Sequence, residues 1–149
     1  MATIKYRFEK TLSKTECLIV PVWQDKGIEV SARQIGAEVF RSGKEVIELK
    51  DFVGKRGQVS MVYTSDTHAP RLILVGLGLQ KDAVIRHLKR AIGTAVIVAQ
   101  QKQAKKLALA VAPSIVKVFG MKKLAKETAI AAAVASYAIR WLKLHNPRN

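Results

Sequence analysis

Apolar and polar positions alternate in different ways along the chain, and the clearest pattern spans residues 71–82. A continuous apolar run follows Pro70, closes in a Gly-Leu-Gly turn at 76–78 and leads into a charged helix start. An apolar run without alternation is typical of a strand that is covered on both faces. Such strands occur in layered α/β domains, which usually bind ligands at the carboxyl ends of their strands. The pattern therefore predicts an α/β fold and makes this glycine turn the first candidate site.

The rest of the chain predicts further strands and helices. Period-2 alternation and short buried runs indicate strands, whereas apolar residues at helical spacing indicate helices. Residues 45–49 fit either a helical turn or a short strand, and residues 51–57 are too rich in glycine and charge for a strand interior. We expect strands at 3–8, 16–22, 58–64 and 106–111 besides the one at 71–75, a helix at 28–40 that stops near Gly43, a helix from Lys81, and a helix of about 24 residues from Met121.

The helix from Lys81 separates apolar from basic positions. Val84, Leu88 and further apolar residues share one face at helical spacing, and a cluster of basic residues falls on the opposite face. Asp82 is expected to cap the start of this helix. The pattern predicts a helix that packs on a sheet and turns its basic side towards water.

The last predicted helix carries two apolar stripes. One of them can pack on the sheet, and the other consists of Ile130, Val134, Tyr137 and Trp141. This second stripe either widens the contact with the core or forms an interface with another subunit or with a domain outside this sequence. We favour the domain outside this sequence, because this last helix leads towards it.

Length and cysteine content set limits on the class of protein. The chain has 149 residues, which suffices for one domain with its own core, and we take 1–149 as a single domain. The only cysteine, Cys17, lies in an apolar segment, which predicts a buried, reduced thiol and a cytoplasmic protein. No apolar stretch approaches the roughly 20 residues that a membrane-spanning helix needs, so we expect no membrane partner.

The positive charge is concentrated in the second half of the chain. The formal net charge is +15; residues 1–82 carry 13 Lys/Arg and 10 Asp/Glu, whereas residues 83–149 carry 13 Lys/Arg and a single acid, Glu127. A surface of this kind attracts polyanions and binds nucleic acid non-specifically at low salt. Charge alone does not identify the partner.

The sequence lacks the residue patterns that support catalysis or metal binding. The histidines His68, His87 and His145 are far apart, and neither an HExxH motif nor a Cys-x-x-Cys pair occurs. After Asp66 the only acids are Asp82 and Glu127, too few for a metal cluster or an acid–base pair in the second half. We therefore expect no catalytic residue, no metal site and no cofactor in this chain.

The glycine turns at 76–78 and 54–57 are the two candidate phosphate sites. The first lacks the third glycine of a dinucleotide-binding fingerprint, and no Gly-Lys-Ser/Thr sequence forms a P-loop. The acidic Asp82 at the helix start also disfavours an anion there. Both segments are better explained as tight structural turns.

Two motifs in sequence resemble a known family. An Asp-Phe-x-Gly-Lys-x-Gly turn at 51–57 precedes a strand and then the Val-Gly-Leu-Gly strand end at 75–78, and an Ala-rich helix reaching Tyr137 follows. This order is similar to the amino-terminal domain of the leucine (cytosol) aminopeptidases, from the strand near Cys17 through Leu144. The resemblance implies a macro-domain-like fold, a three-layer α/β/α sandwich with a mixed, mostly parallel sheet.

The resemblance also implies a role. Family members use two metal ions, zinc or manganese, which are held in a carboxy-terminal domain by motifs resembling Asn-Thr-Asp-Ala-Glu-Gly-Arg. The sequence ends at Asn149 before any such motif, so we expect a non-catalytic domain of a leucyl aminopeptidase, a hydrolase that removes amino-terminal residues from peptides. Its implied partners are its own catalytic domain and the other subunits of a homo-hexamer, which we expect to pack on the second apolar stripe.

Nucleic-acid binding is the alternative function. Few aromatic residues lie among the basic positions, so any such binding would depend mostly on phosphate contacts. Fold analogy alone adds a third reading, a nucleotide or ADP-ribose pocket at the strand ends. The candidate phosphate contacts are Arg86, Lys89, Arg90, Lys105, Lys106, Lys122 and Lys123.

Overall fold

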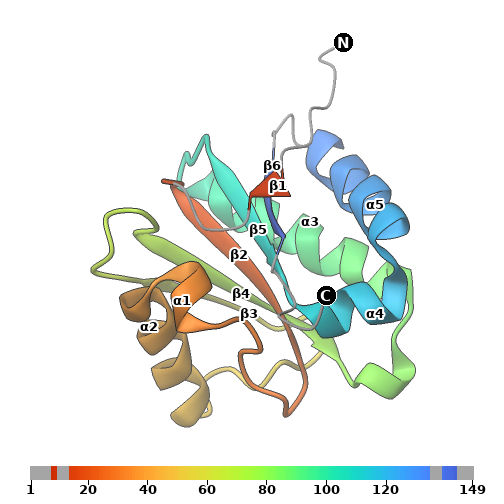
Figure 1. Cartoon of the computed structure of the whole chain (residues 1–149), viewed down its shortest axis with the longest axis horizontal. Coiled ribbons are helices and arrows are strands. Elements are labelled where there is room, and N and C mark those ends of the chain that lie inside the picture. Colours follow the sequence, from red (N-terminus) through yellow and green to blue (C-terminus); the bar gives the residue numbers. More distant parts are fainter. Residues whose placement is uncertain (1–7, 10–13, 135–138, 144–149) are drawn as a thin grey trace.

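A computed structural model describes residues 8–9, 14–134 and 139–143 of the chain. Its centre is a six-stranded sheet in the order β1-β6-β5-β2-β4-β3 (Figure 1). All neighbouring strands are parallel except β3, which runs antiparallel to β4. The strands are β1 (Phe8–Glu9), β2 (Cys17–Trp23), β3 (Val59–Tyr63), β4 (Arg71–Gly78), β5 (Leu107–Val111) and β6 (Ile139–Lys143).

Helices cover both faces of this sheet. Figure 1 shows α1 and α2 on one side and α3, α4 and α5 on the other, which gives three layers. A short 3-10 turn, η1 (Gln80–Asp82), links β4 to the second group. The helices are α1 (Ala32–Ile35), α2 (Ala37–Glu48), α3 (Ile85–Gln101), α4 (Pro113–Phe119) and α5 (Met121–Val134). The predicted α/β/α sandwich with a mixed, mostly parallel sheet is therefore confirmed.

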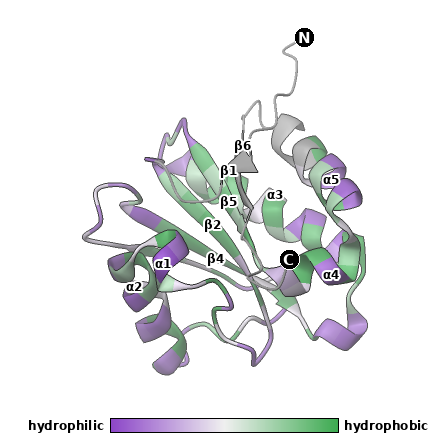
Figure 2. Cartoon of the chain, viewed as in Figure 1, coloured by the Kyte–Doolittle hydropathy of each residue, from purple (hydrophilic) through white to green (hydrophobic). Residues whose placement is uncertain are grey.

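The core lies around the central strands. Every residue of β2 and β5 is buried, and β4 is buried from Leu72 to Gly78. Hydrophobic colour follows these strands in Figure 2, whereas hydrophilic residues gather on the outer sides of the helices. The continuous apolar run in the sequence thus arose because helices cover β4 from both sides.

The predicted stop of the first helix near Gly43 is wrong. Residues 28–40 do not form one helix: α1 and α2 meet at Gly36, and α2 continues through Gly43 to Glu48. A Cβ at Gly43 would lie 2.5 Å from the side chain of Ile28 and 2.9 Å from that of Leu72. This glycine allows α2 to approach the sheet closely, and residues 45–49 belong mostly to the helix.

The predicted length of the last helix is also wrong. Helix α5 ends at Val134, and residues 139–143 form β6, which pairs in parallel with both β5 and β1. Trp141 is aligned with Leu109 of β5 and Phe8 of β1, so it lies in the sheet and does not continue the helical stripe. An Ala-rich segment followed by alternating residues gave a continuous helical pattern, and only the place of β6 beside β5 separates the two elements.

Two smaller differences concern the helix starts. Val84, not Asp82, is the N-cap residue of α3, because Asp82 belongs to the 3-10 turn η1. Helix α4, which begins at Pro113 shortly after β5, was not predicted from the sequence. Proline is well suited to that position because the first helical amides need no partner within the helix.

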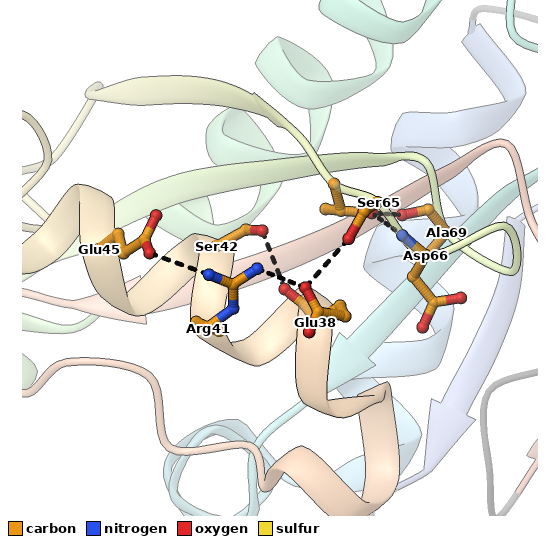
Figure 3. Close-up of polar contacts among 8 residues, drawn as sticks. Glu38, Arg41, Ser42, Glu45, Ser65, Asp66 and Ala69 are labelled. Atoms are coloured by element: carbon orange, nitrogen blue, oxygen red, sulfur yellow. Dashed lines mark hydrogen bonds and ion pairs between the residues drawn. The ribbon is translucent and has the colours of Figure 1, made fainter.

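Polar contacts attach α2 to the loop after β3 (Figure 3). The carboxylate of Glu38 accepts hydrogen bonds from Arg41 on the same helix and from the hydroxyl of Ser65 in the loop. Both contacts lower the pKa of Glu38. This network connects α2 with the loop that follows β3.

Candidate functional site

The turn at 51–57 covers the carboxyl end of β4. The amide of Gly78 donates to the carbonyl oxygen of Gly54 at 3.0 Å, and the amide of Gly76 donates to that of Gln58 at 2.8 Å. A Cβ at Gly76 would lie 2.7 Å from the carbonyl carbon of Gly54. The two motifs that carry the family resemblance therefore pack backbone against backbone, and glycine is required where they meet.

The side chain of Gln58 closes this turn from inside. Its Oε1 accepts hydrogen bonds from the amides of Val53 at 3.0 Å, Gly54 at 3.1 Å and Lys55 at 3.2 Å. Converging amides of this kind can hold an anion. Here they are already occupied by a side-chain oxygen, so the turn is structural, as the sequence analysis favoured.

A small pocket lies beside the turn, at the carboxyl ends of β2 and β4. Its volume is about 180 Å³, and its lining includes Gln24, Arg56, Gly78, Asp82 and His87. This volume is below the roughly 300–1,000 Å³ that is usual for small-molecule sites. The pocket is therefore a recess with polar walls and offers little room for a nucleotide.

Arg56 and His87 form the main polar contact of the pocket. The guanidinium Nη1 of Arg56 lies 2.7 Å from Nε2 of His87, which is 8% exposed. A guanidinium can only donate, so Nε2 is the acceptor and the ring proton resides on Nδ1. Burial lowers the pKa of His87, and the positive charges of Arg56, Arg86 and Arg90 add to this effect. The nearby Asp82 acts in the opposite direction but does not cancel it, so His87 is neutral at pH 7.

Reactive groups elsewhere in the described residues are also few. Cys17 is fully buried, and burial raises the pKa of its thiol, which makes it a poor nucleophile. Among the residues that the structure describes, no group of three or more His, Cys, Asp and Glu could hold a metal ion. In the same residues, no helix is long and apolar enough to span a bilayer.

The candidate phosphate contacts fall into two separate places. Both α3 and α5 run back from the carboxyl edge of the sheet, so Arg86, Arg90, Lys122 and Lys123 lie near the starts of two packed, parallel helices. Between these helices Lys89 pairs with Glu127, with Nζ 3.2 Å from Oε2. The remaining two candidates lie at the opposite edge, just before β5: these are Lys105 and Lys106.

The candidate interface residues do not form one helical stripe. Ile130 lies on α5 and is 44% exposed, and Val134 is the last residue of that helix. Tyr137 lies outside the described residues, and Trp141 belongs to β6. The interface itself stays a prediction, and Ile130 is the member whose side chain the structure describes as exposed.

The pocket pair was not found from the sequence. Arg56 and His87 are separated by 31 positions, and neither belongs to a motif with a known partner spacing. A helical pattern that placed His87 beside the buried Leu88 was the only available signal, and it did not indicate which loop would contact the ring.

Comparison with known sequences matches most of the chain to one family. A family model described as the N-terminal domain of the cytosol aminopeptidase family matches residues 19–143. A probable cytosol aminopeptidase from Syntrophotalea carbinolica is 31% identical over 104 residues, which are 68% of this chain and 21% of the relative. The chain thus spans about a fifth of the length of the curated relatives it matches.

Solved structures with the same fold include a leucine aminopeptidase and several macrodomains. A mutant of tomato leucine aminopeptidase matches with a TM-score of 0.69 at 17% identity, covering 98% of this chain and 34% of that one. The macrodomain of Mycobacterium tuberculosis DarG matches with a TM-score of 0.67 at 11% identity, covering 95% and 99% of the two chains. At these identities the likeness shows the fold alone, and it confirms a macro-domain-like arrangement.

Proposed function

The chain belongs to the cytosol aminopeptidase family, as its amino-terminal domain, and on this basis we propose that it is a non-catalytic domain that packs against a leucyl aminopeptidase catalytic domain. The proposal rests on one observation: the two family motifs pack against each other backbone to backbone. Gly54 and Gly76 bring two backbones together, and Gln58 occupies the amides that a ligand would need. The most characteristic residues thus maintain a shape, and the amides of the turn are not free to bind a ligand.

In this proposal the chemistry belongs to a carboxy-terminal domain. That domain holds two divalent metals, zinc or manganese, and removes amino-terminal residues from peptides in the cytoplasm. The present chain, a single domain over 1–149, supplies packing surfaces for the catalytic domain and for the other subunits of a hexamer. Exposed Ile130 on α5 is the first residue that we assign to this surface, followed by Val134 and Tyr137 of the predicted stripe. Trp141 lies in β6 and is not part of that helix face.

Two measurements test the proposal. The purified chain should not hydrolyse leucine p-nitroanilide with or without added manganese, and metal-dependent turnover would contradict a non-catalytic role.

A chimera that carries this chain in place of the amino-terminal part of the Syntrophotalea carbinolica relative should assemble and hydrolyse the substrate. Ile130→Glu should impair assembly of the chimera, whereas Ile97→Glu, at a similarly exposed position on α3, should not. Equal assembly of both variants would remove Ile130 from the interface.

A second candidate function, nucleic-acid binding, is favoured by the charges at the starts of α3 and α5. Arg86, Arg90, Lys122 and Lys123 lie on neighbouring helices, and the one acid of α5, Glu127, is already paired with Lys89. Phosphate contacts of this kind give affinity that falls steeply with salt.

Charge reversal at the two edges of the sheet separates specific placement from overall charge. Arg86→Glu with Arg90→Glu should weaken binding to duplex DNA at ~50 mM salt much more than Lys105→Glu with Lys106→Glu. The two double variants change the net charge equally but lie at opposite edges. No binding of duplex DNA by the unmodified chain at this salt concentration would rule out a defined DNA site. Equal losses of DNA affinity in both double variants would rule it out as well.

A further inference from the structure

Strand β3 ends the sheet and has an open edge. It pairs with β4 on one side only, and no described strand lies on the other. The amide of Gly76 donates to Gln58, and the amide of Thr64 donates to Pro70. Hydrogen-bonded and non-hydrogen-bonded pairs alternate along an antiparallel ladder. The even-numbered residues from 58 to 64 therefore direct their backbone amides and carbonyls towards β4. The amides and carbonyls of Val59, Met61 and Tyr63 therefore point away from the sheet.

This edge lacks the features that usually prevent pairing with another strand. Natural edge strands carry lysine, proline, a bulge or an inward-pointing charge. The sequence of β3 is Val-Ser-Met-Val-Tyr, with regular register along its whole length against β4. Its last residue, Tyr63, is 63% exposed. Valine and tyrosine, which make up most of β3, are enriched in strands.

We propose that β3 is a docking edge for β3 of a second copy of this chain, which pairs with it antiparallel about a two-fold axis at Met61. In this register Met61 faces Met61, and Val59 faces Tyr63. All of these are hydrogen-bonded pairs, because the same odd-numbered residues present their backbone groups on both copies. The Val59–Tyr63 contacts are aromatic to β-branched, a favourable cross-strand combination. The result is one sheet that continues through both subunits.

Charge at the two ends of β3 favours this orientation. Exposed Lys55 precedes the strand, whereas Arg56 is directed to His87. Asp66, which also contacts His68, follows the strand. Antiparallel pairing places the basic end of one copy beside the acidic end of the other, whereas parallel pairing would place like charges together. The edge is therefore complementary to itself in backbone hydrogen bonds, in side-chain pairs and in charge.

The expected dimer is weak. A single pair of five-residue strands buries less than the roughly 1,200 Å² of a standard stable interface. We expect dissociation constants in the range of about 10 μM to 1 mM, which is usual for small transient contacts. The inference does not depend on the aminopeptidase assignment, because it uses only the edge strand of this chain.

The first test is the concentration dependence of the unmodified chain. Sedimentation equilibrium from about 10 μM to 1 mM should show a monomer–dimer equilibrium. Over the same range, amide hydrogen exchange measured by NMR should slow at Val59, Met61 and Tyr63. Exchange at Ser60 and Val62, whose amides already face β4, should not respond. A monomer throughout the range, or a dimer without this alternating protection, would overturn the proposal and leave the edge to another partner.

Variants at the edge supply the second test. Met61→Pro removes an outward amide without removing one that faces β4, and proline is tolerated at such edge positions. It should weaken dimerisation by about tenfold or more, since both hydrogen bonds at the two-fold axis are lost. Tyr63→Lys should weaken it as well and does not depend on proline being accepted. The control is Ile97→Lys on α3, which adds the same charge at a side chain that is 55% exposed. Loss of the dimer in the control, or its persistence in both edge variants, would contradict the proposed pairing.

Discussion

Replacing Gly76 by alanine tests whether the family motifs serve backbone packing. The added Cβ would lie 2.7 Å from the carbonyl carbons of both Gly54 and Lys55, and closer still to the Lys55 carbonyl oxygen. Backbone atoms cannot rotate away as a flexible side chain can. The turn at 51–57 must therefore move off β4, or β4 must bend.

The expected loss follows from two contributions. Forcing extra volume into a packed site costs about 1–3 kcal/mol. Displacing the turn also weakens the hydrogen bonds from Gly76 to Gln58 and from Gly78 to Gly54, at about 0.5–1.5 kcal/mol each. The free energy of unfolding should fall by about 2–6 kcal/mol, a large part of the roughly 5–15 kcal/mol of a typical domain.

Two other glycines serve as matched controls. Gly93 lies inside α3 with no atom within 4 Å of an added Cβ, so Gly93→Ala should raise the free energy of unfolding by about 0.5–1 kcal/mol. Gly57 has equal space but a φ of +86°, so Gly57→Ala should cost about 1–2 kcal/mol through backbone strain alone.

Urea denaturation followed by far-UV circular dichroism measures all three variants. The buried Trp23, which stacks on Phe119, provides a second probe by fluorescence. Steric contact between Gly76 and the turn contributes nothing beyond backbone strain if Gly76→Ala is destabilised no more than Gly57→Ala, and that result would refute the packing role of Gly76.

Two further predictions concern the groups around the turn. Gln58→Ala should lower the free energy of unfolding by about 1–3 kcal/mol, because three amides lose their acceptor, while Gln58→Glu, which keeps an oxygen there, should lose less; equal urea midpoints for the two variants would contradict this. The lowered pKa of His87 means that the folded state binds its proton less readily than the unfolded chain, whose value is near 6.5. This group's contribution is therefore fully present above about pH 6.5 and is lost as the pH falls through the folded pKa. Between pH 7.5 and 5 the urea midpoint should fall less for His87→Gln than for the unmodified chain. Equal falls in the two proteins would contradict the pH-dependent contribution assigned to His87.

Local sequence patterns determined the central elements correctly. The unbroken apolar run of β4, the buried run of β2 and the alternation of β3 each identify a strand, because burial on one or two faces leaves a periodic trace within a few residues. The two glycine motifs also indicated the family. The predicted turn at 76–78 is wrong, because these residues belong to β4. Gly76 and Gly78 instead pack against the backbone of the turn at 51–57, which explains why the two motifs occur together.

Interactions between distant segments were decided only by the tertiary structure. The Ala-rich helical pattern of the sequence continues past Val134. Only the pairing with β5 makes residues 139–143 a strand. In the sequence Gly43 indicates the end of a helix, but in the structure it lies inside α2 and allows this helix to pack closely on Leu72. Arg56 and His87, likewise, meet only because the turn folds over β4.

The sequence by itself thus determined the layered α/β fold, the family and the basic character of the second half. The fold class and the charge follow from composition and short-range periodicity, whereas the family follows from the resemblance of the two glycine motifs. The tertiary structure decided what each glycine approaches, which cations lie together and which strand is left with an open edge. Those outcomes depend on which segments become neighbours in space, and no single segment encodes its neighbour.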